Sequence, residues 1–131
     1  MVDSVAFAGS AIEHRSAMIA NELLVLGTAL TPYLALVSID AWMHEASRQV
    51  PRVERWLHYS AGALFLGFLI ALFSRANLIA LVLFGAFAAL TIWDEIGFHR
   101  ELAANERRVH TAAYVALALF LCVWGWLERA S

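Results

Sequence analysis

The stretch DAWMHEASRQVPRVERWLH, residues 40–58, contains two copies of one short pattern, one on each side of a turn. In each copy an acidic residue is followed four positions later by histidine: Asp40 with His44, and Glu54 with His58. Residues four apart lie on one face of a helix about a turn apart, so each copy directs a carboxylate and an imidazole the same way. Each copy therefore offers two ligands to a metal ion.

A second stretch, EIGFHRELAANERRVH at residues 95–110, repeats this arrangement with a shorter turn. Its two copies are Glu95 with His99 and Glu106 with His110. Internal repeats in membrane proteins commonly place a shared site at the interface between the repeats. The doubling predicts two similar helical hairpins, related by a pseudo-twofold axis that passes through one site.

Long apolar segments flank both stretches. Hydrophobic residues make up 62% of the 131 residues, charged residues make up 15%, and the mean hydropathy is +0.69, which is too apolar for an ordinary soluble domain. Each segment approaches the ~20 residues that cross a bilayer as a helix. We expect an all-α fold, a transmembrane four-helix bundle of two repeated antiparallel hairpins, in a single integral membrane domain over residues 1–131. The predicted helices are about 16–47, 51–74, 77–101 and 105–128.

Arginines are concentrated around the two motif-bearing turns. Those that flank these turns are Arg48, Arg52, Arg55, Arg100, Arg107 and Arg108. Those toward the opposite side are Arg15, Arg75 and Arg129. The positive-inside rule then predicts that the motif-bearing turns are cytoplasmic, in an inner or plasma membrane, and that both termini lie on the opposite side.

The composition also excludes two classes of function. The net charge is −2, and no basic stretch is interleaved with aromatic residues, so nucleic acid is not an expected partner. Cys122 is the only cysteine, which excludes an internal disulfide and a cysteine-based zinc cluster.

Helix direction predicts which motif residues share a level in the membrane. In each hairpin the first helix runs toward the turn and the second runs away from it, and the two members of each pattern are ~6 Å apart along the axis. Asp40 is therefore level with His58, and His44 with Glu54. The same argument for the second hairpin predicts that the eight motif residues converge in two layers of one dinuclear site. One layer holds Asp40, His58, Glu95 and His110, and the other holds His44, Glu54, His99 and Glu106.

Four carboxylates and four imidazoles suit two adjacent transition-metal ions, with iron the first expectation and zinc or manganese the alternatives. In these eight residues the chain resembles the di-metal carboxylate four-helix proteins, the ferritin-like and related di-iron class. The resemblance implies ligands from all the helices, directed into the core of the bundle. Its spacing differs, because that class has Glu-x-x-His on two helices and lone Glu residues on the other two.

Two further residues lie beside the motifs. Asp94 is five positions before His99, which turns it away from the motif face, so we expect a supporting or interfacial role for it rather than a ligand role. Tyr114 lies one turn beyond His110 and has the phase to approach the site as a hydrogen-bond donor or redox partner. Tyr114 is therefore the candidate catalytic residue.

A single histidine or glutamate near a membrane interface is more often a solvated flank than a ligand. Four matching patterns favour a site, because buried ionisable groups in a membrane are costly and usually face the bundle interior with a partner. We expect an integral membrane metalloprotein of the oxidoreductase type, in which a di-iron centre activates O2 or carries electrons toward a lipidic or quinone-like substrate.

Two alternatives remain open. A transition-metal transporter or metal-handling protein is favoured by the small size and by Glu22, toward the far end of the first helix. A b-type haem protein, with His44 and His99 as axial ligands, explains the histidines but not the carboxylates. The expected partners are the lipid bilayer and a hydrophobic small molecule or metal ions, and a homo-oligomer is also open.

Overall fold

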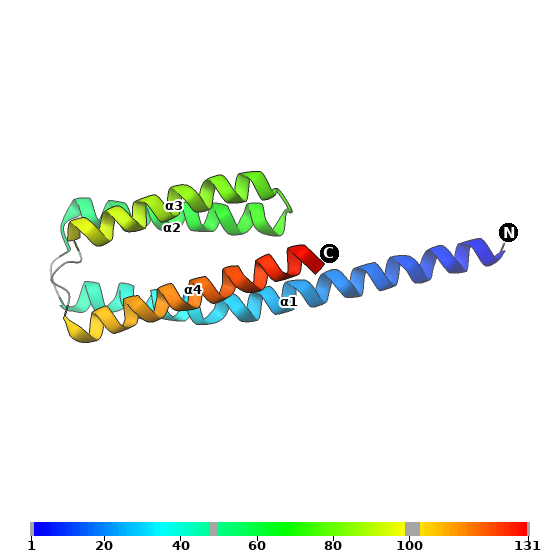
Figure 1. The fold of residues 1–131 in the computed structure, drawn as a ribbon, viewed down its shortest axis with the longest axis horizontal. Helices are drawn as coiled ribbons and strands as arrows, with labels where there is room; N and C mark the ends of the chain where they lie inside the picture. The colour runs from blue at the N-terminus through cyan, green and yellow to red at the C-terminus, as the bar shows by residue number, and fades with distance from the viewer. Residues whose placement is uncertain (1, 48–49, 99–102, 131) are drawn as a thin grey trace. The chain divides into compact units, whose positions relative to one another are not determined.

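The computed structural model describes residues 2–47, 50–98 and 103–130, and it describes side chains for residues 18–45, 50–98 and 103–129. In this part of the chain the fold is all-helical, as predicted, with four helices (Figure 1). They are α1 (Val2–Ser47), α2 (Arg52–Phe73), α3 (Asn77–Phe98) and α4 (Ala104–Ala130). The boundaries agree with the predicted ones to within two residues, apart from the start of α1 and the end predicted at residue 101, which lies outside the described residues.

Helix α1 begins at Val2 rather than near residue 16. The preceding sequence VDSVAFAGSAIEHR contains no proline and several alanines, so nothing in it ends a helix. Within the described residues, four segments are long and apolar enough to cross a membrane, as an integral membrane protein requires. These segments are Met18–Glu45, Arg52–Phe73, Asn77–Phe98 and Ala104–Arg129.

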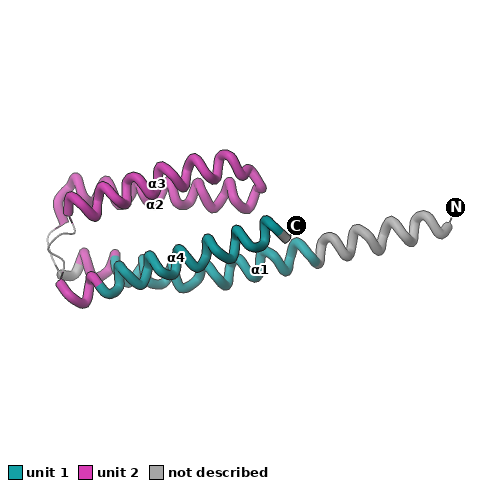
Figure 2. The backbone as a smooth tube through the Cα atoms, viewed as in Figure 1, with its two compact units in different colours: residues 1–40, 108–131 teal, residues 41–107 magenta. Residues whose placement is uncertain are grey.

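The chain divides into two compact units (Figure 2). Unit 1 consists of residues 1–40 and 108–131, and unit 2 consists of residues 41–107. Unit 2 therefore contains α2 and α3 together with the end of α1 and the start of α4. The rest of α1 and α4 belongs to unit 1. The repeat of two hairpins and the single domain over residues 1–131 stay predictions.

The core of unit 2 is aromatic. Phe68 is fully buried, and its ring lies 5.3 Å from that of Phe84, while Phe65 lies 5.1 Å from Phe87. The second contact lies nearer the N-terminus of α2 and nearer the C-terminus of α3 than the first contact does. The two helices therefore pack along a continuous seam, and the seam leads to the polar residues at the start of α2.

The turn between α2 and α3 closes the other end of this seam. The Ala76 N–H donates to the Ala71 carbonyl over 2.8 Å, and the Arg75 N–H donates to the Leu72 carbonyl over 3.0 Å. This pair of bonds is the Schellman arrangement that ends many helices. It requires a left-handed residue, and Arg75 takes that conformation with φ 57° where glycine is usual.

Unit 1 has a core of its own. Its buried side chains on α1 include Leu26 and Tyr33, and those on α4 include Leu117 and Phe120, which is fully buried. Helix α1 continues through Pro32. Near the proline, the Thr31 hydroxyl donates a hydrogen bond to the Gly27 carbonyl of the same helix over 2.9 Å. Such internal hydrogen bonds are needed in a membrane, because the bilayer core holds no water to accept them.

The Phe68→Ala substitution should lower the free energy of unfolding by about 2 kcal/mol. It leaves a cavity of roughly 100 Å³ at about 24 cal/mol per Å³, and lipid tails are as apolar as the core, so the cavity is the main cost. Denaturation in mixed micelles, followed by circular dichroism, measures the change. Leu66→Ala is the control, because Leu66 lies on the same helix with 58% of its surface exposed. Equal losses in the two variants would contradict the packing described here.

The Arg75→Gly substitution should stabilise the protein by about 1 kcal/mol, since it removes the cost of a left-handed conformation at a residue with a Cβ atom. The same denaturation assay tests this. Ser74→Gly is the matched control, because Ser74 has φ −85° and gains no such relief. A destabilised Arg75→Gly protein would show that the arginine side chain outweighs the backbone strain.

Candidate metal site

Glu54 and His58 lie on the packed face of α2. Glu54 precedes Phe68 by two seven-residue steps, and His58 precedes Phe65 by one. A step of seven residues returns to nearly the same face of a helix, so the candidate ligands continue the row of core side chains. Glu54 is fully buried, and the His58 side chain is 34% exposed. The aromatic packing of the seam thereby fixes the direction of both groups.

Helix α3 contributes Asp94 in the same way. Asp94 follows Phe87 by seven residues and Ala80 by fourteen, and all three are buried. Asp94 Oδ2 lies 2.9 Å from His58 Nε2. Sequence reasoning assigned Asp94 a supporting role and named Glu95 as the ligand. The structure brings Asp94 together with Glu54 and His58, and the signal for this in the sequence is the series Ala80, Phe87 and Asp94 at intervals of seven residues.

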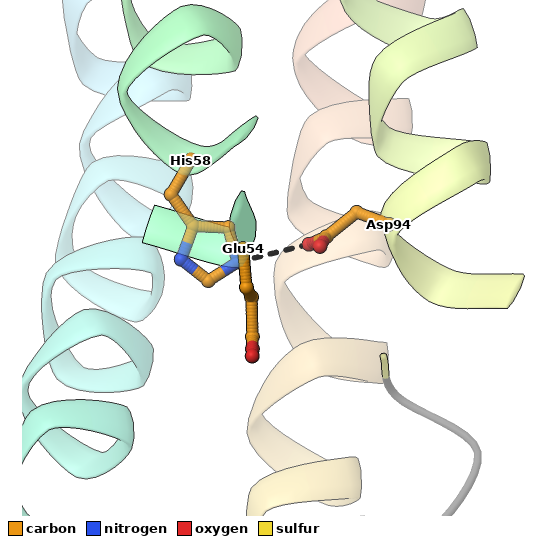
Figure 3. A group of neighbouring side chains, drawn as sticks. All are labelled: Glu54, His58 and Asp94. Atoms are coloured by element: carbon orange, nitrogen blue, oxygen red, sulfur yellow. Dashed lines mark hydrogen bonds and ion pairs between the residues drawn. The ribbon is translucent and has the colours of Figure 1, made fainter. Parts of the chain in front are cut away.

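Glu54, His58 and Asp94 form one compact group (Figure 3). One ligand atom from each residue lies within 4.8 Å of the other two. In the part of the chain that the structure describes, no other group of three His, Cys, Asp or Glu side chains meets this criterion. One imidazole and two carboxylates suit iron, manganese or zinc.

His44 borders this group. It lies in the last turn of α1, is 2% exposed, and contacts His58 edge to face with ring centroids 5.6 Å apart. Glu45, which follows His44, also contacts α2, since its Oε1 atom lies 3.5 Å from Nε of Arg55. That ion pair is exposed and contributes little stability. His44 is therefore a candidate fourth ligand within unit 2.

Unit 1 contains a separate polar contact. His110 Nδ1 lies 3.1 Å from Asp40, and both side chains are largely buried. The ring of Tyr114 lies 5.3 Å from that of His110, edge to face. Tyr114 is thus in contact with a motif histidine, which the phase of the helix predicts. Its catalytic role stays a prediction.

The remaining motif residues divide into three cases. Glu106 is buried near the start of α4, with 6% of its surface exposed. Glu95 is half-buried on α3, next to Asp94. His99 lies outside the described residues. The convergence of all eight motif residues on one dinuclear site stays a prediction.

Comparisons of the chain with known protein families, with curated proteins and with solved structures found no match.

Asp94→Asn should weaken metal binding on the order of 10- to 100-fold, and Glu95→Gln should weaken it less. Both variants keep side-chain size and remove one negative charge, and the two positions are adjacent on α3. Titration of the purified, chelator-treated protein with Co²⁺ measures the affinities. A larger loss in Glu95→Gln would show that Glu95, and not Asp94, is the ligand.

Proposed function

We propose that this chain is an integral membrane metalloprotein that binds a transition-metal ion at Glu54, His58 and Asp94. The observation that supports the proposal is the approach of the ligand atoms to within 4.8 Å on the buried seam of α2 and α3. Two carboxylates at such a distance repel by roughly 3 kcal/mol at an effective dielectric constant of 20. A divalent cation offsets this repulsion and also uses the imidazole.

Iron is the first expectation for the ion, and zinc and manganese are the alternatives. Nitrogen and oxygen donors together favour these metals, and three protein ligands leave positions open for a further ligand such as His44 or for a reactant. The reaction class that follows is that of an oxidoreductase acting on O2 or on a lipidic or quinone-like substrate. Apolar helices around the site support a substrate that arrives from the bilayer.

A dinuclear centre on the eight motif residues is the extended form of this proposal. It takes its support from the resemblance to the di-iron carboxylate proteins and from the two-layer argument. In the proposed arrangement the motif-bearing turns are cytoplasmic and both termini lie on the opposite side. The distribution of arginines supports that orientation.

Metal transport or handling is the second candidate function. It is favoured by Glu22, a half-buried acidic residue of α1 inside the apolar segment Met18–Glu45. Ionisable residues inside such segments commonly mark ion paths. The haem alternative, with His44 and His99 as axial ligands, has less support, because it leaves the grouped carboxylates of Glu54 and Asp94 without a role.

Metal analysis of the detergent-purified protein, together with its absorption spectrum, tests the proposal. We expect bound iron, no Soret band, and a lower melting temperature after chelation, because metal loss leaves two carboxylates facing each other on the seam. A Soret band would establish haem instead. Zinc without iron would favour a structural, hydrolytic or transport role.

Glu54→Gln supplies the matched variant for this test. It keeps the volume of the fully buried side chain and removes a charged ligand, so it should lower the metal content while the protein remains folded. A wild-type protein that holds no metal, takes up none on reloading and melts unchanged with chelator would overturn the proposed function.

A further inference from the structure

The buried positions of α2 have equivalents on α4, and each equivalent lies the same number of residues further along the chain. The equivalent pairs are Glu54 and Glu106, His58 and His110, Phe65 and Leu117, and Phe68 and Phe120. The acidic members are both buried, the histidines are both partly buried, and Phe68 and Phe120 are both fully buried. The agreement extends over four helical turns, so the two helices present the same sequence of polar and apolar groups on their packed faces.

The buried positions of α1 have equivalents on α3 in the same way, again with a constant number of residues between the members of each pair, although this number differs from that for α2 and α4. The equivalent pairs are Leu26 and Ala80, Tyr33 and Phe87, and Asp40 and Asp94. Five of these six residues are buried, and Asp40 is nearly so, with its side chain 16% exposed. This alignment matches Asp40 with Asp94, whereas the motif spacing alone matches Asp40 with Glu95.

Each compact unit joins one histidine to one aspartate from these equivalent positions. In unit 2 the His58 Nε2 to Asp94 Oδ2 distance is 2.9 Å, and in unit 1 the His110 Nδ1 to Asp40 distance is 3.1 Å. Two ligand atoms that bind one ion at about 2.0–2.2 Å are about 2.8–3.6 Å apart for octahedral or tetrahedral angles. Both pairs therefore have the separation of neighbouring ligands as well as that of a hydrogen bond.

We infer that Asp40 and His110 form a second metal-binding position, equivalent to that of Asp94 and His58, and that it takes the same transition metal. The inference rests on the proposed function, since it assigns to unit 1 the role proposed for the group in unit 2. Glu106 precedes His110 by one helical turn on α4, as Glu54 precedes His58 on α2. Each chain then has the capacity for two ions.

The second position also assigns a role to Tyr114. Its ring contacts the His110 ring, and the α2 residue at the equivalent position is Gly62, which has no side chain. The two positions therefore differ in one neighbouring phenol. A metal bound at His110 would have a redox-active side chain beside it, whereas a metal bound at His58 would have none from this position.

Cobalt titration of the whole chain in detergent tests the inference. The chelator-treated protein is titrated anaerobically with Co²⁺, the visible absorption of the bound ion is followed, and metal content is measured after removal of excess Co²⁺. Wild-type protein should bind two ions per chain. His110→Gln and Asp40→Asn should each bind one, His58→Gln should bind one, and the His58→Gln and His110→Gln double variant should bind none.

Two controls separate ligand loss from misfolding. Glu128→Gln changes an exposed carboxylate of α4 and should leave two ions bound. Asp40→Glu keeps the carboxylate and should retain the second ion, which Asp40→Asn loses. Helical circular dichroism of each variant verifies that the helices persist.

The outcomes distinguish the two proposals. One ion in the wild type that persists in His110→Gln overturns the second position and leaves the proposed function standing. Two ions in both the wild type and His110→Gln also overturn the second position. Loss of both ions from a helical His110→Gln protein overturns the equivalence of two positions. No Co²⁺ binding by the wild type overturns the proposed function itself.

Discussion

A carboxylate buried between apolar helices must be matched by a hydrogen-bond donor or a cation, and the organisation of the motif end of unit 2 depends on this requirement. Glu54 is fully buried and Asp94 nearly so. His58 meets Asp94 at hydrogen-bond distance. An ionised carboxylate at membrane depth without such a partner costs a few kcal/mol or more. The contact between His58 and Asp94 meets this requirement for one of the two buried carboxylates.

The packing of α2 and α3 directs this set. Positions seven residues apart along α2 and α3 are occupied by phenylalanines along the seam and by Glu54, His58 and Asp94 at its end. Interlocked aromatic rings hold the two helices in one register, so they also hold the ligand atoms at a defined separation. Under the proposed function, a site built on rigid helices in this way would need little reorganisation to bind an ion. The proposed metal binding would thus be coupled to helix packing through the same residues.

This coupling bears on the choice between catalysis and transport. An ion that is transported must exchange its ligands on each cycle, which requires the site to open. Within the proposed function, buried carboxylates in a closely packed seam favour a retained ion over a transported one. The histidine–aspartate contact in unit 1, with Tyr114 beside it, fits the same proposal.

The sequence by itself determined the all-helical fold of the described residues, the helix boundaries around the first motif turn and the positions at which polar residues interrupt apolar segments. These features depend on local composition, on proline and on hydrophobic length, all of which are visible along the chain. It also placed Glu54 and His58 on one helical face, because their spacing of four residues is about one turn, while their role as metal ligands stays a prediction. Only the tertiary structure decided that Asp94, and not its neighbour Glu95, joins the compact group with Glu54 and His58. Adjacent residues on a helix point about 100° apart, so that choice depends on how α3 is rotated against α2. Phe87 contacts Phe65 across the seam, and Asp94, seven residues further along α3, lies on nearly the same face. The pairing of α2 with α3 was likewise decided by the tertiary structure, because it depends on how Phe65 and Phe68 of one helix interlock with Phe87 and Phe84 of the other.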